Sequence, residues 1–361
     1  MDPAAADASS LLTRLVASCL GTFDMATMYL GLQLGLYRSL AGDGPATSTE
    51  LAGRTGTVER YVREWLEQQT VTGVLHVDDP GAGAGARRYT LPAAHAEVLL
   101  DADNPNFMGA YPQQMISVLV PLPSLMNAFR NGGGVPYEAY GKDCREGIAA
   151  GNRVAFINLL GSEWFPAIPE LHARLRATPS ARVADVGCGL GWSAISIAKA
   201  YPGARVDGLD LDEASVHQAR QNARDSGVAD RVTFAVRDAA DPTLTEKYDL
   251  VVAFETIHDM ARPVEALRAM RRLAADRGMV LVVDERVNEK FTVDPGDIER
   301  LYYGFSVLHC LPAGMAAQPS AATGTVMRPA TLRSYAQQAG FRDIEELPID
   351  FDFWRFYRVL G

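Results

Sequence analysis

The most constraining feature of this 361-residue sequence is a glycine-rich segment between a hydrophobic run and a helical pattern. It reads DVGCGLGW over residues 185–192, after the run RVA and before SAISIAKAY. Glycine lets the backbone approach a ligand closely, and the N-terminus of a helix supplies free N–H groups. The pattern therefore predicts a strand–turn–helix unit that binds a small cofactor.

From Arg182 onward, short apolar runs alternate with helical patterns. This alternation is typical of an α/β fold built on a parallel, Rossmann-like sheet. The sequence ends in FRDIEELPI and FDFWRFYRVL, which we expect to form a closing β-hairpin. The other expected strands are RVADV, ARVDGLDL, RVTFAV, YDLVVAF and GMVLVVDE.

The residues around the glycines indicate which cofactor binds. A dinucleotide-binding fingerprint would have its third glycine where Trp192 stands. GxGxG with an acid two residues before it instead suits S-adenosylmethionine (SAM), whose sulfonium is cationic and which has no pyrophosphate. Asp210 can accept hydrogen bonds from the ribose hydroxyls, and Asp238 with Ala239 can pair with the adenine edge. A glycine turn without a ligand would leave this ordered set of acids unexplained. The expected cofactor-binding residues are Asp185, Gly187, Cys188, Gly189, Gly191, Asp210, Leu211, Asp238, Ala239, Phe254 and Glu255.

Residues 1–103 predict a separate helical domain. The spacing of apolar residues over Leu11–Leu40 predicts two buried helices. Thr47 to Glu50 then cap a short helix that Gly56 closes. A second helix from Val58 carries Tyr61, Val62, Trp65 and Leu66 on its apolar face, and two short strands at 74–77 and 88–91 follow, which completes a winged helix.

A winged helix can bind DNA, but the charge here argues against it. Between residues 49 and 69, three arginines face four glutamates, and the whole chain has a formal net charge of −10. Binding to duplex nucleic acid relies on a basic surface. We therefore expect this domain to form a homodimer interface and one wall of a substrate pocket; a ligand-sensing DNA-binding regulator remains the non-enzymatic alternative.

The compartment can be inferred from cysteine usage and from the N-terminus. The four cysteines show no CxxC pairing, which fits free thiols in a reducing compartment. The N-terminus has no basic segment of the kind that begins a signal peptide, and the apolar stretch Met25–Tyr37 is too short to span a bilayer. We expect a cytoplasmic protein with no membrane partner.

A histidine follows the fourth expected strand, in ETIHDM. Ligands in such sheets bind beyond the carboxyl ends of the strands, so His258 should lie near the transferred methyl group. A second histidine, His309, shares a helical stripe with Ile298, Leu301, Tyr302 and Phe305. The stripe is apolar, so His309 should point inward, either as a core histidine with its hydrogen bonds satisfied or as a ligand.

The chain resembles two groups of class I SAM-dependent methyltransferases. The winged helix and the histidine after the fourth strand resemble the small-molecule O-methyltransferases, in which that histidine is the general base. A fuller resemblance is to the bacterial α-keto acid β-carbon methyltransferases. It is carried by NAFRNGGGVPYEAYG, NRVAF, ADVGCGLGW, ETIHDMARPVEALRAM and ERLYYGFSVLHCLP. It implies a metal ion, iron or zinc, held by His258 and His309, and a role in specialised, antibiotic-type metabolism.

The chemistry of carbon methylation gives such a metal a purpose. A metal that chelates the carboxylate and keto oxygen of a 2-oxo acid stabilises the enolate as it forms. Asp259 is then a third ligand, a base or an orienting group. Arg145 is the favoured partner of the substrate carboxylate, ahead of Arg130 and Arg153. The alternative is a metal-free O-methyltransferase with His258 as base.

The three expected parts are the domain at 1–103, a helical connector at 104–170 that covers the active site, and a SAM-binding methyltransferase domain at 171–361. Aromatic residues of the connector and of the late helix could line an apolar pocket, although core packing is their commoner use. These residues are Phe107, Tyr111, Trp164, Tyr302 and Phe305.

Overall fold

The computed structural model describes residues 8–238 and 240–361. The chain forms two compact units, Met1–Ser117 and Val118–Gly361. The boundaries expected from sequence are at 103 and 170, and the division into three parts stays a prediction.

The larger unit is built on a seven-stranded sheet with the order β5-β4-β3-β6-β7-β9-β8. The first five strands along the sheet are parallel, and β9 runs antiparallel to both β7 and β8. The predicted parallel sheet with a closing hairpin is confirmed. The strands are β3 (Arg182–Val186), β4 (Arg205–Asp210), β5 (Val232–Val236), β6 (Tyr248–Phe254), β7 (Ala274–Glu285), β8 (Asp343–Glu346) and β9 (Trp354–Leu360).

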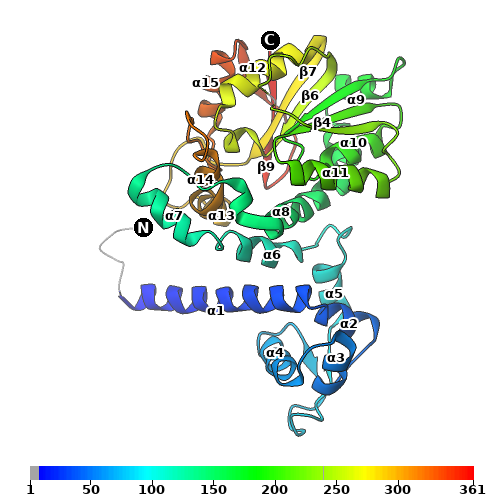
Figure 1. Ribbon diagram of the computed structural model, residues 1–361, viewed down its shortest axis with the longest axis vertical. Helices are drawn as coiled ribbons and strands as arrows, with labels where there is room; N and C mark the ends of the chain where they lie inside the picture. Colours follow the sequence, from blue (N-terminus) through cyan, green and yellow to red (C-terminus); the bar gives the residue numbers. More distant parts are fainter. Residues whose placement is uncertain (1–7, 239) are drawn as a thin grey trace. The chain divides into compact units, whose positions relative to one another are not determined.

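Helices cover both faces of this sheet (Figure 1). Successive residues of a strand point to opposite faces, so Val183 packs in one buried cluster and Ala184 in the other. One face is covered by η3 (Phe156–Trp164), α9 (Pro169–Arg176), α10 (Trp192–Ala200) and α11 (Glu213–Asp225). The other is covered by α12 (Pro263–Leu273) and α15 (Pro329–Gln338). Burial on both faces explains why the strands read as continuous apolar runs.

Two further helical segments of this unit contribute to the site. The first comprises α7 (Leu122–Asn131), the short helix η2 (Tyr137–Tyr140) and α8 (Gly141–Ala155). The second is a continuous run of α13 (Asp297–Phe305), η5 (Ser306–Cys310) and α14 (Leu311–Gly314). The Tyr140 hydroxyl donates to the Leu308 carbonyl at 2.9 Å, which joins the two segments. The segment η5 is π-helical, a conformation that occurs frequently at functional sites.

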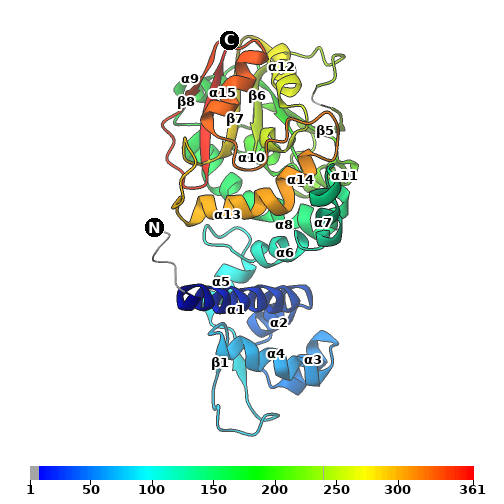
Figure 2. The ribbon, with the colours of Figure 1, turned by 90° about the vertical axis from the view of Figure 1, so that its left-hand side faces the viewer.

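The N-terminal unit contains the expected winged helix, with a short β1–β2 hairpin as its wing (Figure 2). Thr47 and Glu50 form a capping box at the start of α3, and Gly56 ends that helix with φ 66°. Both were predicted from sequence. The elements are α1 (Ala8–Gln33), α2 (Leu36–Gly42), α3 (Ser48–Thr55), α4 (Glu59–Val71), β1 (His76–Val77), β2 (Tyr89–Thr90), α5 (Ala93–Leu100) and α6 (Ala110–Ser117).

Two expectations for this unit were wrong. Leu12 and Phe23 of α1 are 63% and 65% exposed, so the two predicted helices form but the first is not buried. The core of the unit consists of α2 to α5 and the wing, and it reaches only the end of α1, where Gly31 is buried. Tyr61, expected on the apolar face of α4, is 78% exposed, whereas Val62, Trp65 and Leu66 are buried.

The length of α1 also differs from expectation. The helix begins at Ala8, well before the apolar stretch at Met25, and is 26 residues long. Among the described residues, α1 alone is both long enough and apolar enough to cross a membrane, judged by length and composition. A buried core helix and a signal sequence pass the same test, and α1 lies near the N-terminus, so its length is weak evidence for a membrane span.

Candidate active site

A pocket of about 1170 Å³ opens at the carboxyl ends of β3, β4 and β6. The strand ends supply one side, and residues of η2, α8 and η5 supply the other. Ligands of open α/β sheets bind at this edge. The expected location of the site is therefore where the structure has its cavity.

The glycine loop forms the floor of the pocket. Gly187, Gly189 and Gly191 have φ of 72°, 49° and 81°, in the left-handed region that favours glycine. A Cβ on Gly187 would lie 2.2 Å from Thr256 Oγ1, and one on Gly191 would lie 2.5 Å from the Phe234 ring. Gly187, Cys188 and Gly189 line the pocket. The backbone of this loop therefore lies open to a ligand, as the motif predicted.

Two of the predicted aspartates, Asp210 and Asp238, face the cavity. Asp210 lines it and accepts hydrogen bonds from the N–H groups of Gly189 at 2.7 Å and Asp212 at 2.9 Å. Burial raises the pKa of Asp210. Asp238 also lines the pocket, with one oxygen 3.0 Å from the Arg262 guanidinium. Leu211 also lines the pocket and is exposed, while Ala239 is outside the described residues.

Asp185 has a different position from the other acids. It is 1% exposed, and its Oδ2 accepts a hydrogen bond of 2.5 Å from the Ser193 hydroxyl at the start of α10. Burial raises its pKa to about 7. Asp185 therefore joins the end of β3 to the start of α10, and it is absent from the pocket wall formed by the described residues.

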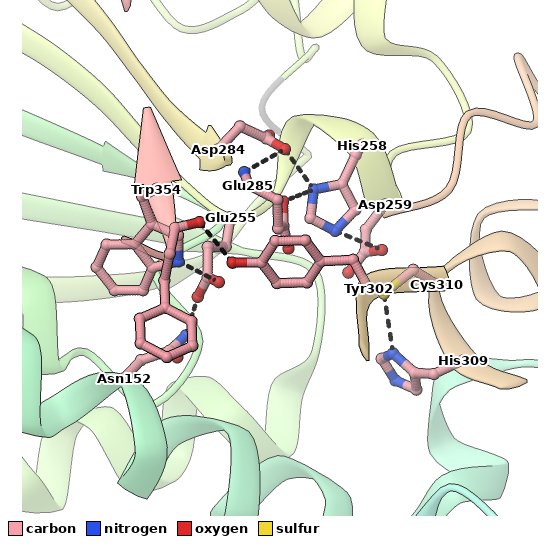
Figure 3. A network of polar contacts seen from close by, with 11 residues as sticks. Asn152, Glu255, His258, Asp259, Asp284, Glu285, Tyr302, His309, Cys310 and Trp354 are labelled. Atoms are coloured by element: carbon pink, nitrogen blue, oxygen red, sulfur yellow. Dashed lines mark hydrogen bonds and ion pairs between the residues drawn. The ribbon is translucent and has the colours of Figure 1, made fainter. Parts of the chain in front are cut away.

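His258 lies in η4 (Ile257–Asp259), directly after β6, and is 2% exposed. Its Nδ1 lies 2.8 Å from Asp284 Oδ1 and 2.9 Å from Glu285 Oε2, and its Nε2 lies 3.2 Å from Asp259 Oδ1 (Figure 3). Burial opposes the charged imidazolium, but Glu285, Asp284 and Asp259 outweigh it and raise the pKa of His258 well above its usual value. The imidazole is therefore held on both sides by carboxylates.

Asp284 and Glu285 were not among the residues singled out from sequence. The signal was available, because they end the fifth strand, GMVLVVDE, beside the strand that leads to His258. Neighbouring parallel strands end at the same edge of a sheet. Two acids there are natural partners for a histidine.

His309 lies in η5 and is 2% exposed, so it points inward as predicted. Its ring packs edge-on against Tyr140 and Tyr137, with centroid distances of 4.6 and 5.7 Å. Nδ1 lies 3.4 Å from Cys310 Sγ, and Nε2 has no hydrogen-bond partner among the described residues. Burial lowers the pKa of His309, which also lines the pocket. It is therefore a buried, neutral imidazole with one nitrogen unsatisfied.

Metal-ligating atoms approach one another closely in two groups of described residues. One consists of His258, Asp259 and Cys310, and the other of His258, Asp284 and Glu285, with ligand atoms within 4.8 Å in each. His309 belongs to neither group, although its ring contacts Cys310 (Figure 3). The metal pair of His258 and His309 thus stays a prediction, and Cys310 is a neighbour that the sequence analysis missed.

Glu255 directly follows β6 and has a strained conformation, with φ 48°. Its Oε1 accepts a hydrogen bond of 2.5 Å from Trp354 Nε1 on β9, and its Oε2 accepts one from the Asn152 side chain on α8. Burial raises the pKa of Glu255 to about 7. Glu255 and Phe254 both line the pocket, so these two predicted cofactor-site residues lie where a ligand could reach them.

The three candidate arginines have different surroundings. Arg145 lines the pocket, with Nε 3.5 Å from Asp212 Oδ2. The Arg153 guanidinium lies over the Trp192 ring, 4.6 Å from its centroid. Arg130 is exposed in the last turn of α7. Among these three, Arg145 is the one in the pocket wall.

Of the two uses left open for the aromatic residues of the connector and the late helix, core packing is the one seen for Trp164, Tyr302 and Phe305. Trp164 packs in the core against Trp354 and Phe356, and the Tyr302 hydroxyl donates to the Phe353 carbonyl at 2.5 Å. Phe305 packs against the small core of α7 and α8. Phe107 and Tyr111 belong to the N-terminal unit, whereas the described lining residues all belong to the larger one. The aromatic lining comes instead from Tyr137, Phe156, Trp192 and Phe254.

Comparison with known families agrees with both units. Residues 177–321 match the model of a methyltransferase domain, and residues 24–100 match the model of an Rv2258c-like winged HTH domain. A curated relative, the methyltransferase GfsG of Streptomyces halstedii, is 31% identical over 116 residues, which are 32% of this chain and 41% of that protein. The chain thus spans less than half the length of this relative.

Solved structures share the whole architecture. The mitomycin 7-O-methyltransferase MmcR matches with a TM-score of 0.72 and 19% identity, over 98% of each chain. Human N-acetylserotonin methyltransferase, solved in complex with SAM, matches with a TM-score of 0.68 and 19% identity, over 100% of each chain. At this identity the likeness shows the fold: a Rossmann-like methyltransferase sheet with an N-terminal winged helix.

Proposed function

This chain carries a SAM-dependent methyltransferase domain, and we propose that it methylates the β-carbon of a small α-keto acid with the help of a bound metal ion. The observation that carries the proposal is the position of His258 Nε2. It faces Asp259 Oδ1 at 3.2 Å, and His258 is absent from the described pocket wall, where Asp259 and His309 are present. A general base that acts on a hydroxyl needs a nitrogen open to the substrate.

The residues around the imidazole suit a metal ligand. Asp284 lies against Nδ1 at 2.8 Å, which favours the tautomer that has its lone pair on Nε2. The raised pKa of His258 places a proton on Nε2 when no metal is bound, and a metal ion between Nε2 and the Asp259 carboxylate would take the place of that proton. A metal bound there would act as a Lewis acid toward the keto oxygen of the substrate. Nε2 of His258 and the Asp259 carboxylate would hold it, and His309 remains the second imidazole that the resemblance implies.

The remaining residues have roles that do not depend on the metal. The glycine loop and Asp210 would hold SAM with its methyl group toward η4. His309, buried between two tyrosine rings, offers Nε2 as a hydrogen-bonding group at the edge of the acceptor space. Arg145 in the pocket wall offers a cation for the substrate carboxylate.

A second candidate function is metal-free O-methylation. The pairing of Nδ1 with Asp284 also suits a general base, because the carboxylate stabilises the imidazolium that forms. For this reaction the Asp259 side chain, 31% exposed, would have to turn away from Nε2. The structural neighbours named above include an O-methyltransferase, which shares the fold.

The position of the new methyl group distinguishes the two functions. The purified protein is supplied with SAM carrying a ¹³C-labelled methyl group, with a series of 2-oxo acids, and with phenols of similar size. We expect the label on a carbon adjacent to the keto group, as shown by its carbon chemical shift. A label on oxygen would overturn the proposal in favour of the second candidate.

Metal dependence is tested on the same reaction. We expect exhaustive chelation to abolish methyl transfer and added zinc or iron to restore it. Full activity after chelation, verified by elemental analysis, would exclude the metal from the mechanism. Asp284→Asn is the matched variant: it keeps the shape of the side chain but weakens the hold on Nδ1, and it should lower metal affinity about 10- to 100-fold.

A further inference from the structure

We infer that Cys310 supplies a thiolate ligand to this metal, which completes a three-residue site with His258 Nε2 and the Asp259 carboxylate and makes zinc its preferred ion. The inference rests on the proposed metal-assisted function. It differs from the resemblance, which names His258 and His309.

The geometry of the three side chains is the first argument. One ligand atom from each of His258, Asp259 and Cys310 lies within 4.8 Å of the others, a distance at which a single ion can contact all three. His258 and Cys310 are 2% and 7% exposed, so they are screened from water, while Asp259 reaches the pocket. The residues come from η4 and η5, two segments that only the fold brings together.

The local backbone is the second argument. Ser306–Cys310 is a π-helical segment between two α-helical ones. The wider turn lets the consecutive residues His309 and Cys310 both be buried at the site. His309 Nε2 is buried, has no partner among the described residues and belongs to a residue that lines the pocket, so it remains available to a substrate next to the three ligands.

The number and type of ligands are the third argument. Three protein ligands leave a coordination position for the acceptor, as in catalytic zinc sites, whereas a fourth would close the site. Zinc is commonly bound by a mixture of Cys, His and Asp, and magnesium, calcium and manganese prefer oxygen ligands. Excluding His309 from the ligands leaves its ring free to contact the substrate.

Cobalt(II) provides a spectroscopic test. The full-length protein is first changed at Cys19→Ser, because this exposed thiol could bind cobalt by itself. The metal-free protein is then titrated with cobalt chloride. We expect one equivalent to bind with a near-ultraviolet thiolate-to-cobalt charge-transfer band, and zinc to displace it.

Three variants in this background assign the ligand. Cys310→Ser should lose the charge-transfer band. Loss of a residue that only hydrogen-bonds to a metal ligand lowers metal affinity about 10- to 100-fold, and loss of the ligand Cys310 should lower it by more. Cys144→Ser, at another buried cysteine, should keep the band. His309→Asn should keep it as well. Circular dichroism confirms that each variant is folded.

The other outcomes distinguish failure of the thiolate ligand from failure of the proposed metal-assisted methylation. A cobalt spectrum unchanged in Cys310→Ser would overturn the thiolate ligand and leave a metal site without it. Loss of cobalt binding in His309→Asn, with the band retained in Cys310→Ser, would restore the two-histidine site. Failure of the unsubstituted protein to bind cobalt or zinc would overturn both this inference and the metal-assisted function.

Discussion

Trp354 Nε1 donates a hydrogen bond of 2.5 Å to Glu255 Oε1, which ties the last strand of the sheet to the strand that ends at the pocket. Trp354→Phe leaves this buried oxygen without its donor. We expect the free energy of unfolding to fall by about 1 to 3 kcal/mol. A double-mutant cycle with Glu255→Ala, measured by chemical denaturation, separates the hydrogen bond from the lost ring volume. A coupling energy near zero would show that the bond contributes nothing.

Gly187→Ala is expected to damage the cofactor site. The new Cβ would sit at a φ of 72° and 2.2 Å from Thr256 Oγ1, so the loop must shift. We expect SAM affinity, measured by titration calorimetry, to fall at least about 10-fold, equivalent to about 1.4 kcal/mol. Gly203→Ala is the control, since a Cβ there meets nothing within 4 Å. Equal affinities for the two variants would count against the loop as the SAM site.

Asp185 gives the protein a specific pH dependence. Burial raises the pKa of Asp185 to about 7 in the folded protein, whereas the pKa of an aspartate in an unfolded chain is about 3.9. Between these values the unfolded chain has lost a proton that the folded chain retains, so stability falls as pH rises. The slope from this group is at most about 1.4 kcal/mol per pH unit.

Asp185→Asn removes this titration and keeps an oxygen for Ser193. Its free energy of unfolding between pH 4 and 7 should therefore decline less steeply than that of the unchanged protein. Asp230→Asn, at a side chain 72% exposed, is the control and should leave the slope as it was. Parallel curves for Asp185→Asn would mean that burial does not shift this group.

The exposed apolar residues of α1 predict self-association. Leu12, Leu15, Leu20 and Phe23 are each more than half exposed, and a second copy of the chain would cover them. We expect a homodimer by analytical ultracentrifugation, and Leu15→Glu with Leu20→Glu should shift it to monomer. Tyr61→Ser, at an exposed aromatic of α4, should leave the dimer intact. A monomeric unchanged protein at micromolar concentration would refute this expectation.

Arg145→Met tests which ligand this arginine binds. If it pairs with the substrate carboxylate, the variant loses a charge-assisted bond of about 1.5 to 3 kcal/mol, and KM for the 2-oxo acid should rise about 10- to 100-fold. SAM affinity should change little. The opposite pattern would assign Arg145 to the cofactor, consistent with its 3.5 Å distance from Asp212. Lys142→Met, an exposed cation of the same helix, is the control.

The sheet could be predicted because burial on both faces makes each strand an unbroken apolar run. The glycine loop could be predicted because backbone conformations with positive φ favour glycine. Helical spacing shows that a helix has an apolar face, but not whether this chain packs against that face. The exposure of Leu12 and Phe23 could therefore not be predicted. The same limit applies to the acceptor site. Asp284 could have been found from its place at the end of the strand beside that of His258. Cys310 and Tyr137 reach the site through contacts between distant segments, and no local pattern marks such contacts.

The π-helical segment at Ser306–Cys310 has a consequence for how this site tolerates change. A π-turn holds one more residue than an α-turn, so deleting one residue there would restore an even helix. Because the wider turn already absorbs the extra residue, α13 and α14 would keep nearly the same orientation about the helix axis, and only the residues of this turn would change place. The pair of His309 and Cys310 could then no longer both occupy their present positions, while the helix itself survived. Two chains of the same fold can thus differ by one residue in this helix, and only the longer one has both the imidazole and the thiol at its acceptor site.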